Sequence, residues 1–190
     1  MEIEWIGNKQ IAEGPYGSCA LFDGSSCVKL EKRPIENMYK TKWSVVFPAY
    51  ITSTAESQFL INFQSHSTDN LEYNIRIAVT NNQKLFFYTE AEHHDTLWVI
   101  SPENTISMNK WFLVAVTSDG ENIKLYYNGE VVAEGTFTNG SFYKEESTIF
   151  VGGSVDSAYP LYVLNGGMIG KIDFYDECLS QECIANYLEQ

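Results

Sequence analysis

The residues whose types could do chemistry are densest in one stretch, residues 89–95, which reads TEAEHHD. In an extended strand, side chains alternate, so Glu90 and Glu92 would share one face. Two carboxyl groups about 5–5.5 Å apart are what retaining glycoside hydrolysis requires. The stretch follows the end of a predicted strand, however, and no Trp-rich substrate cleft is predicted beside it. We therefore expect no catalytic residues here, and glycoside hydrolysis is the less favoured hypothesis.

The same stretch contains possible ligands for a transition metal, namely His93, His94 and Asp95. Adjacent side chains on an extended chain point in opposite directions, so both imidazoles cannot easily ligate one ion. A solvated acidic loop is the favoured interpretation.

Charge excludes two classes of partner. The chain has 25 acidic and 12 basic residues among 190, which gives a net charge of −13. Nucleic acids and anionic membranes both attract clustered Lys and Arg, so we expect no nucleic-acid binding and no membrane insertion.

Targeting signals are not evident in the sequence. The first residues, MEIEWIGNKQIAEG, have neither the basic nor the apolar region of a signal peptide, and no apolar run approaches the ~18–20 residues of a membrane span. Localisation is left open, with a virion or cell surface reached by another route among the alternatives.

Four cysteines are too few for a disulfide scaffold at this length. Cys19 and Cys27 flank one predicted turn, while Cys178 and Cys183 flank the start of the last predicted helix. Neither pair has the C-x₂-C spacing of a metal site, so we predict free, buried thiols.

Strand patterns dominate the chain, and 44% of its residues are hydrophobic. Tight turns are predicted at Asn81-Asn82, Asp119-Gly120 and Asn128-Gly129 between segments that alternate apolar and polar residues. Only the end looks helical, where Ser180 can cap QECIANYL, with Ile184, Tyr187 and Leu188 on one side. Short strands at near-regular spacing predict an all-β sandwich or jelly roll, as a single domain over residues 1–190.

Three segments, in this order, resemble one family. They are ALFDGSSCVKL, NKWFLVAVTSDGENIKLYYNGEVVAEG and IFVGGS…GMIGKIDFYDECLSQECIANYL. Together they resemble the laminin-G-like jelly rolls of the concanavalin A-like lectin/glucanase superfamily, from about Trp5 to Tyr187 and least over residues 53–107. The resemblance implies a concanavalin A-like jelly-roll β-sandwich of two antiparallel sheets, with a short C-terminal helix.

Function is less constrained, because this superfamily includes lectins, adhesion modules, glucanases and virion-surface proteins. Its glucanases carry a Glu-x-Asp-x-x-Glu motif, which Glu90, Glu92 and Asp95 match in spacing with the acid types exchanged.

The resemblance also implies a structural Ca²⁺ between an amino-terminal turn and the last strand. Asp173 would supply a carboxylate, and backbone carbonyls would come from Asp23, Gly24 and the segment near Glu13. Alternatively, Asp23 only shapes its own turn and Asp173 pairs with a buried polar group.

We expect a non-catalytic binding module, carbohydrate-binding or adhesive, whose partner is a glycan or a glycosylated surface. Sugars dock on aromatic rings flanked by polar groups, and loops at the rim of the jelly roll combine both. The candidate rings are Tyr73, Trp98, Tyr159 and Tyr162, and the candidate polar groups are His66, Asp69, Asn70 and Asp156. Each ring could instead pack in the core. The alternative function is a structural or decoration protein on a virion or phage surface.

Several weak sites bind more strongly when they are linked, so we also expect a homo-oligomer or docking on a larger particle. The segment IEWIG with Trp5 and Ile6, and the last helix with Tyr187 and Leu188, are the predicted surfaces. Their alternative role is to close the edge of the sandwich.

Overall fold

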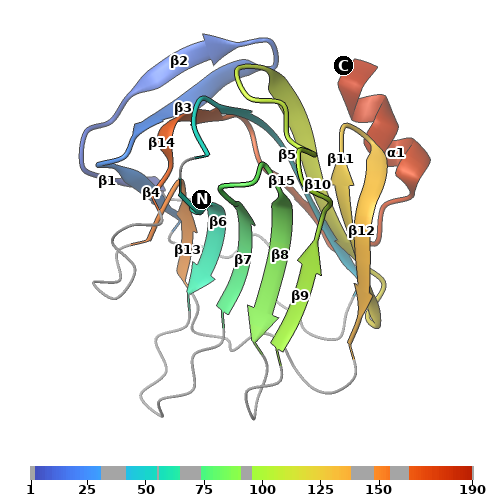
Figure 1. Cartoon of the computed structure of the whole chain (residues 1–190). Helices are drawn as coiled ribbons and strands as arrows, with labels where there is room; N and C mark the ends of the chain where they lie inside the picture. The colour runs from blue at the N-terminus through green and yellow to red at the C-terminus, as the bar shows by residue number, and fades with distance from the viewer. Residues whose placement is uncertain are drawn as a thin grey trace.

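The fold is a sandwich of two antiparallel sheets (Figure 1). It is seen in a computed structural model, which describes residues 3–30, 42–54, 56–64, 74–90, 96–137, 148–154 and 163–189. The predicted jelly-roll β-sandwich with a short C-terminal helix is confirmed.

Among the described residues, one sheet has seven strands. In spatial order they are β1 (Ile3–Ile6), β4 (Cys27–Leu30), β13 (Thr148–Val151), β6 (Gln58–Gln64), β7 (Asn74–Val79), β8 (Leu85–Glu90) and β9 (Thr96–Ile100).

The other sheet has eight strands within the ranges that the structure describes. Its main path runs β12 (Glu130–Thr136), β11 (Asn122–Tyr127), β10 (Trp111–Ser118), β5 (Trp43–Ile51), β14 (Asn165–Ile169), β3 (Gly17–Asp23) and β2 (Ile11–Gly14), while β15 (Asp173–Tyr175) also pairs with β5.

The core lies between the sheets because alternate residues of each strand point inward. On β10, Phe112, Val114 and Val116 belong to this core, and on β5 Val45 and Phe47 do.

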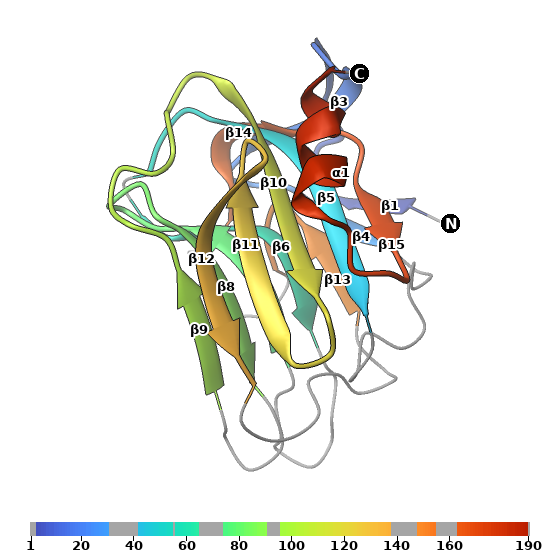
Figure 2. The same cartoon turned by 90° about the vertical axis from the view of Figure 1, so that its right-hand side faces the viewer.

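The residues of β5 and β10 that point away from this core are buried as well, because a helix covers them. α1 (Gln181–Ala185) and the 3₁₀ turn Asn186–Glu189 lie against the outer face of the eight-stranded sheet (Figure 2). Ile184 packs there in a second cluster with Val46, Leu113, Ala115 and Tyr126. The Ser180 cap is confirmed, since its Oγ accepts a hydrogen bond from the Cys183 N–H, but Leu188 is exposed.

The predicted hairpin at Asn128-Gly129 is confirmed. Both residues have positive φ, 50° and 82°, and Asn128 Oδ1 also accepts a hydrogen bond from the Leu113 N–H at 2.8 Å. In the β7–β8 turn, by contrast, the positive φ falls on Gln83 rather than on Asn81-Asn82.

Two other segments differ from their strand patterns. The strands β3 and β4, on either side of Asp23-Gly24, belong to different sheets, so this turn carries the chain across the sandwich. The segment GGMIGKIDFYDE contains two strands, β14 and β15, because Lys171 and Ile172 interrupt the pairing with β5, whereas the N–H of Gly170 still donates to the Pro48 carbonyl at 2.9 Å.

All four cysteines are free. Cys19 and Cys27 are buried as predicted, but Cys178, which precedes α1, is half-buried. Cys183 is exposed, because only one side of α1 faces the sheet. Burial raises the pKa of Cys27 to about 11.

We expect Cys183 to react first with a thiol reagent such as Ellman's reagent at mildly alkaline pH. Cys19 and Cys27 should react only after unfolding, because a thiolate has to form and be reached. A Cys183→Ser variant should lose the fast phase, and a fast phase that survives in it would contradict the assignment.

No helix in the described part of the chain is long and apolar enough to cross a lipid bilayer.

Candidate functional site

The outward face of the seven-stranded sheet carries a continuous row of large side chains. Backbone register aligns Phe150 on β13, Asn62 on β6, Arg76 on β7, Tyr88 on β8 and Trp98 on β9. We call these five residues the cross-strand row. Their neighbours along each strand point into the core, so the row is presented on the other side of the sheet.

Aromatic rings support the exposed end of the row. Phe59, Ala78, Phe86 and Tyr88 form a buried cluster separate from the main core. The ring of Trp98 lies 4.4 Å from that of Tyr88 and 5.7 Å from that of Phe86, centroid to centroid. Trp98 nevertheless keeps 54% of its surface exposed, so it forms a supported platform that faces solvent.

Arg76 is held in place by the same rings. Its guanidinium carbon lies 5.3 Å from the centroids of both Phe59 and Tyr88, which is cation–π geometry. Beside it, Asn62 is only 2% exposed, and its Oδ1 has no hydrogen-bond partner among the described residues.

Polarity changes along the strands on this face. On one side of the cross-strand row lies an apolar row, Phe59, Ala78, Phe86 and Ile100. On the other side lie Thr148 and Gln64, and the backbone of Asn74 aligns with Gln64. Most of these side chains are buried, and Trp98 and Ile100 on β9 are the large apolar ones that are exposed. Gln64 already accepts a hydrogen bond from Ser154.

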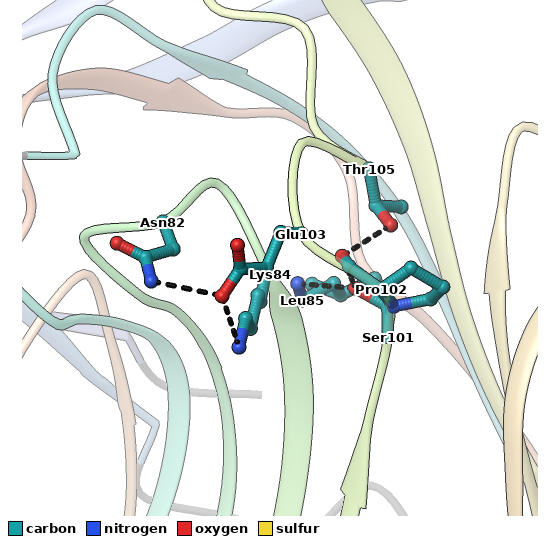
Figure 3. A network of polar contacts seen from close by, with 7 residues as sticks. All are labelled: Asn82, Lys84, Leu85, Ser101, Pro102, Glu103 and Thr105. Atoms are coloured by element: carbon teal, nitrogen blue, oxygen red, sulfur yellow. Dashed lines mark hydrogen bonds and ion pairs between the residues drawn. The ribbon is translucent and has the colours of Figure 1, made fainter.

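A network of polar contacts fixes the β8–β9 pair that carries Tyr88 and Trp98 (Figure 3). The N–H of Leu85 donates to Ser101 Oγ at 2.9 Å, and the N–H of Ser101 donates back to the Leu85 carbonyl at 2.9 Å.

Glu103 accepts from Asn82 Nδ2 at 3.1 Å and pairs with Lys84 Nζ at 3.0 Å. These contacts lower its pKa, the hydrogen bond from Lys84 most. They hold the turn between β7 and β8 against the segment that follows β9.

Among the predicted binding residues, Trp98 is described, but it lies within strand β9 rather than in a rim loop. The remaining ones lie outside the described residues: Tyr73, Tyr159, Tyr162, His66, Asp69, Asn70 and Asp156. The same holds for Glu92, His93, His94 and Asp95, while Glu90 ends β8.

Sequence reasoning missed Asn62, Arg76 and Tyr88 as site residues. The available signal was the alternation in YNIRIAV and LFFYTE, which puts Arg76 and Tyr88 on the face opposite the core. Their alignment with Trp98 comes from strand register, which the pattern alone does not specify.

The predicted calcium ligands at the amino-terminal turn are the backbone carbonyls of Asp23 and Gly24, and the side chain of Asp23 is engaged in that turn. Asp23 Oδ1 accepts hydrogen bonds from the Ser25 hydroxyl at 2.7 Å and its N–H at 3.0 Å, and Oδ2 accepts one from Gln10 Nε2 at 2.7 Å. The bond from the Ser25 hydroxyl contributes most to lowering the pKa of Asp23. The carboxylate thus shapes its own turn, as the alternative interpretation states.

Asp173 lies elsewhere. Its Oδ1 pairs with Lys171 Nζ at 2.7 Å, so its partner is an exposed cation, not a buried polar group. Asp173 pairs with Val46 on β5. Phe22, the neighbour of Asp23, pairs with Gly167, and Gly167 pairs with Ile51, which lies five residues further along β5. Strand rise then puts Asp23 and Asp173 roughly 20 Å apart.

Glu13 lies on β2, where it accepts a hydrogen bond from the Ser18 hydroxyl at 2.8 Å. The four predicted residues therefore do not fit a single ion, and no cluster of three or more acidic, His or Cys residues occurs in the described ranges. A bound calcium ion stays a prediction.

We expect EGTA to leave the melting temperature unchanged, because Asp173 lies roughly 20 Å from the turn whose carbonyls would complete the site. Differential scanning fluorimetry with EGTA and then with millimolar calcium checks this. A rise in melting temperature on adding calcium, but not magnesium, would show that an ion binds.

A family model described as the concanavalin A-like lectin/glucanases superfamily matches residues 22–185. No curated protein matches the sequence significantly.

Several solved structures share the fold. The binding domain of Paraclostridial mosquitocidal protein 1 is 13% identical with a TM-score of 0.73, over 98% of this chain and 46% of that one. The botulinum neurotoxin serotype D binding domain is 17% identical with a TM-score of 0.68, over 98% and 46%. This chain thus spans about half the length of those two binding domains.

A third similar structure is domain 4 of AbnA, an extracellular arabinanase from Geobacillus stearothermophilus, in complex with arabinotriose. It is 16% identical with a TM-score of 0.68, over 95% of this chain and 81% of that one. The family match covers most of the chain and agrees with its two-sheet architecture, so this protein belongs to the laminin-G-like branch of the concanavalin A-like lectin/glucanase superfamily.

Proposed function

We propose that the protein is a non-catalytic carbohydrate-binding module and that its ligand docks on Trp98, the exposed end of the cross-strand row. The observation that carries this proposal is the Trp98 ring, which is 54% exposed although it stacks on buried aromatic side chains. A large ring held in one orientation at the surface offers contact area without much loss of side-chain entropy on binding.

The chemistry around the ring suits a sugar. The apolar face of a pyranose or furanose stacks on an aromatic plane, and its hydroxyl groups bond to amide, hydroxyl and guanidinium groups. The guanidinium of Arg76 packs on Tyr88, the ring that supports Trp98. Thr96 is exposed two residues before Trp98 on the same strand.

Hydrolysis is less well supported on this face. The cross-strand row contains aromatic, amide and guanidinium groups and no carboxylate, whereas glycoside hydrolysis needs a pair of carboxyl groups. A row of this composition can bind a saccharide but lacks a general acid and a nucleophile.

The comparisons agree with this proposal at the level of the fold. Two of the similar structures are binding domains, one of them from a botulinum neurotoxin, and a third was solved with arabinotriose. Because one fold hosts many functions, these likenesses guide the choice of ligands to test and do not identify the ligand.

The test is a glycan array that includes arabino-oligosaccharides, followed by titration calorimetry of the glycans that bind. We expect Trp98→Ala to weaken binding by about tenfold or more, because it removes the stacking surface. Tyr16→Ala is the matched control, since Tyr16 is also an exposed ring but borders the eight-stranded sheet; it should bind like the unmodified protein. Equal affinity of the Trp98→Ala variant, or no binding to any glycan, would refute the proposal.

A further inference from the structure

Strand β9 exposes two large apolar side chains that are neighbours on one face. Trp98 is 54% exposed and Ile100 is 46% exposed, while Val99 between them is buried. Single exposed apolar side chains are common on protein surfaces, whereas contiguous ones can mark a place where a ligand binds. Among the exposed large hydrophobic residues that the structure describes, only this pair shares a strand.

Strand geometry sets the spacing of the pair. Residues two apart on a strand share a face and lie about 7 Å from each other, so a sugar ring stacked on Trp98 can place a substituent against Ile100. Ile100 pairs across the sheet with Phe86, whose ring also supports Trp98 at 5.7 Å, so this end of the platform is apolar. The β-branched side chain of Ile100 has few rotamers and therefore loses little entropy when a ligand covers it.

The opposite end of the platform is polar. Thr96, two residues before Trp98, is exposed, and its hydroxyl group can both donate and accept a hydrogen bond. The strip formed by Thr96, Trp98 and Ile100 thus changes from polar to apolar along β9. A ligand that matches this strip has hydroxyl groups at one end and an apolar group at the other.

Charge does not favour an acidic ligand on this strip. Beyond Ile100 lies the network of Figure 3, in which Lys84 is paired with Glu103 at 3.0 Å. The guanidinium of Arg76 lies over the ring of Tyr88. The net charge of the chain is −13, so its overall field repels anions. A neutral sugar meets no such repulsion.

We infer that the ligand of the Trp98 platform is a neutral sugar that carries a methyl group, either at C6 as in a 6-deoxyhexose or in an N-acetyl group. The sugar ring stacks on Trp98, its methyl group contacts Ile100, and its hydroxyl groups lie toward Thr96. This inference rests on the proposed function and narrows it to one class of sugars.

Titration calorimetry and saturation-transfer NMR with paired sugars test the inference. The pairs are L-fucose against L-galactose and N-acetylglucosamine against glucose, and only the first sugar of each pair has a methyl group. We expect the methyl-bearing sugar of at least one pair to bind about three- to fivefold more tightly, which is the effect of burying one methyl group. Its methyl protons should receive the strongest saturation transfer, and the pair that shows this identifies the position of the methyl group. Galacturonic acid should bind more weakly than galactose.

Ile100→Thr is the decisive variant. It keeps a β-branched side chain, which suits a strand, and replaces an apolar group with a hydroxyl, so the preference for the methyl-bearing sugar should disappear while the fold is retained. Ile11→Thr is the matched control, because Ile11 is 58% exposed on β2 in the other sheet and should leave the preference intact.

The possible failures of the inference and of the proposed function are distinct. Binding that needs Trp98 but shows no preference for a methyl-bearing sugar would overturn the inference and leave the proposed function standing. A preference that survives in Ile100→Thr, or tighter binding of galacturonic acid than of galactose, would do the same. A protein that binds no sugar refutes the proposed function, and the inference fails with it.

Discussion

Replacing Gly152 with Ala is expected to lower the free energy of unfolding by roughly 2–5 kcal/mol, from backbone strain and overpacking together. Gly152 has a φ of +75°, which costs about 1–2 kcal/mol for a residue with a Cβ. An added Cβ would also lie 2.3 Å from Cε1 of Phe22, a fully buried ring of the core.

Neither side of this contact can move easily. The N–H of Gly152 donates to the Leu60 carbonyl at 2.9 Å, and its own carbonyl accepts from the Leu164 N–H at 2.9 Å. The Phe22 ring stacks on Trp5 at 6.2 Å between centroids. The clash therefore strains three segments and both sheets at once.

Gly17→Ala is the matched control for backbone strain. Gly17 has a similar φ of +93°, but nothing lies within 4 Å of the position that a Cβ would take. Urea unfolding should therefore show a loss of only about 1–2 kcal/mol in Gly17→Ala. If both variants lose the same amount, crowding against Phe22 contributes nothing and the argument is wrong.

Phe87→Ala is expected to cost about 3–5 kcal/mol of stability while leaving the Trp98 platform in place. Phe87 is fully buried between the sheets, and its ring centroid lies 6.2 Å from that of Trp43 on β5. Removing the ring leaves a cavity that close-packed neighbours cannot fill.

Phe86→Ala, one residue earlier, should disturb the Trp98 platform more and the stability of the fold less. Phe86 points to the outer face, where its ring supports Trp98 at 5.7 Å and belongs to a buried cluster much smaller than the main core. We expect a smaller stability loss, about 1–3 kcal/mol, together with weaker glycan binding. Urea unfolding and titration calorimetry on both variants separate the two roles, and a shared pattern of effects would contradict the assigned faces.

The adjacent residues Phe86 and Phe87 show how far the sequence reaches. Alternation along a strand already indicates that they face opposite sides, because successive side chains of an extended chain must. Local chemistry likewise determined the Asn128-Gly129 turn, where two positive φ angles are needed, and the Ser180 cap, where a hydroxyl accepts a free helix N–H.

The arrangement of strands was decided by the tertiary structure. β13 lies between β4 and β6, although long segments of sequence separate all three. Such pairings depend on which buried faces complement one another across the sandwich, and no local pattern encodes that choice. The same reason explains why Asp23-Gly24, which looks like a hairpin turn, connects strands of different sheets.

The candidate site shows the same division most clearly. Aromatic content and the superfamily resemblance were enough to predict a binding module and to select Trp98 as one of its rings. They placed Trp98 in a loop and grouped Asp23 with Asp173, because spacing along a chain does not give distance in space. Only register, which is fixed when both sheets bury their apolar faces, aligned Asn62, Arg76, Tyr88 and Trp98 and moved Asp23 and Asp173 apart.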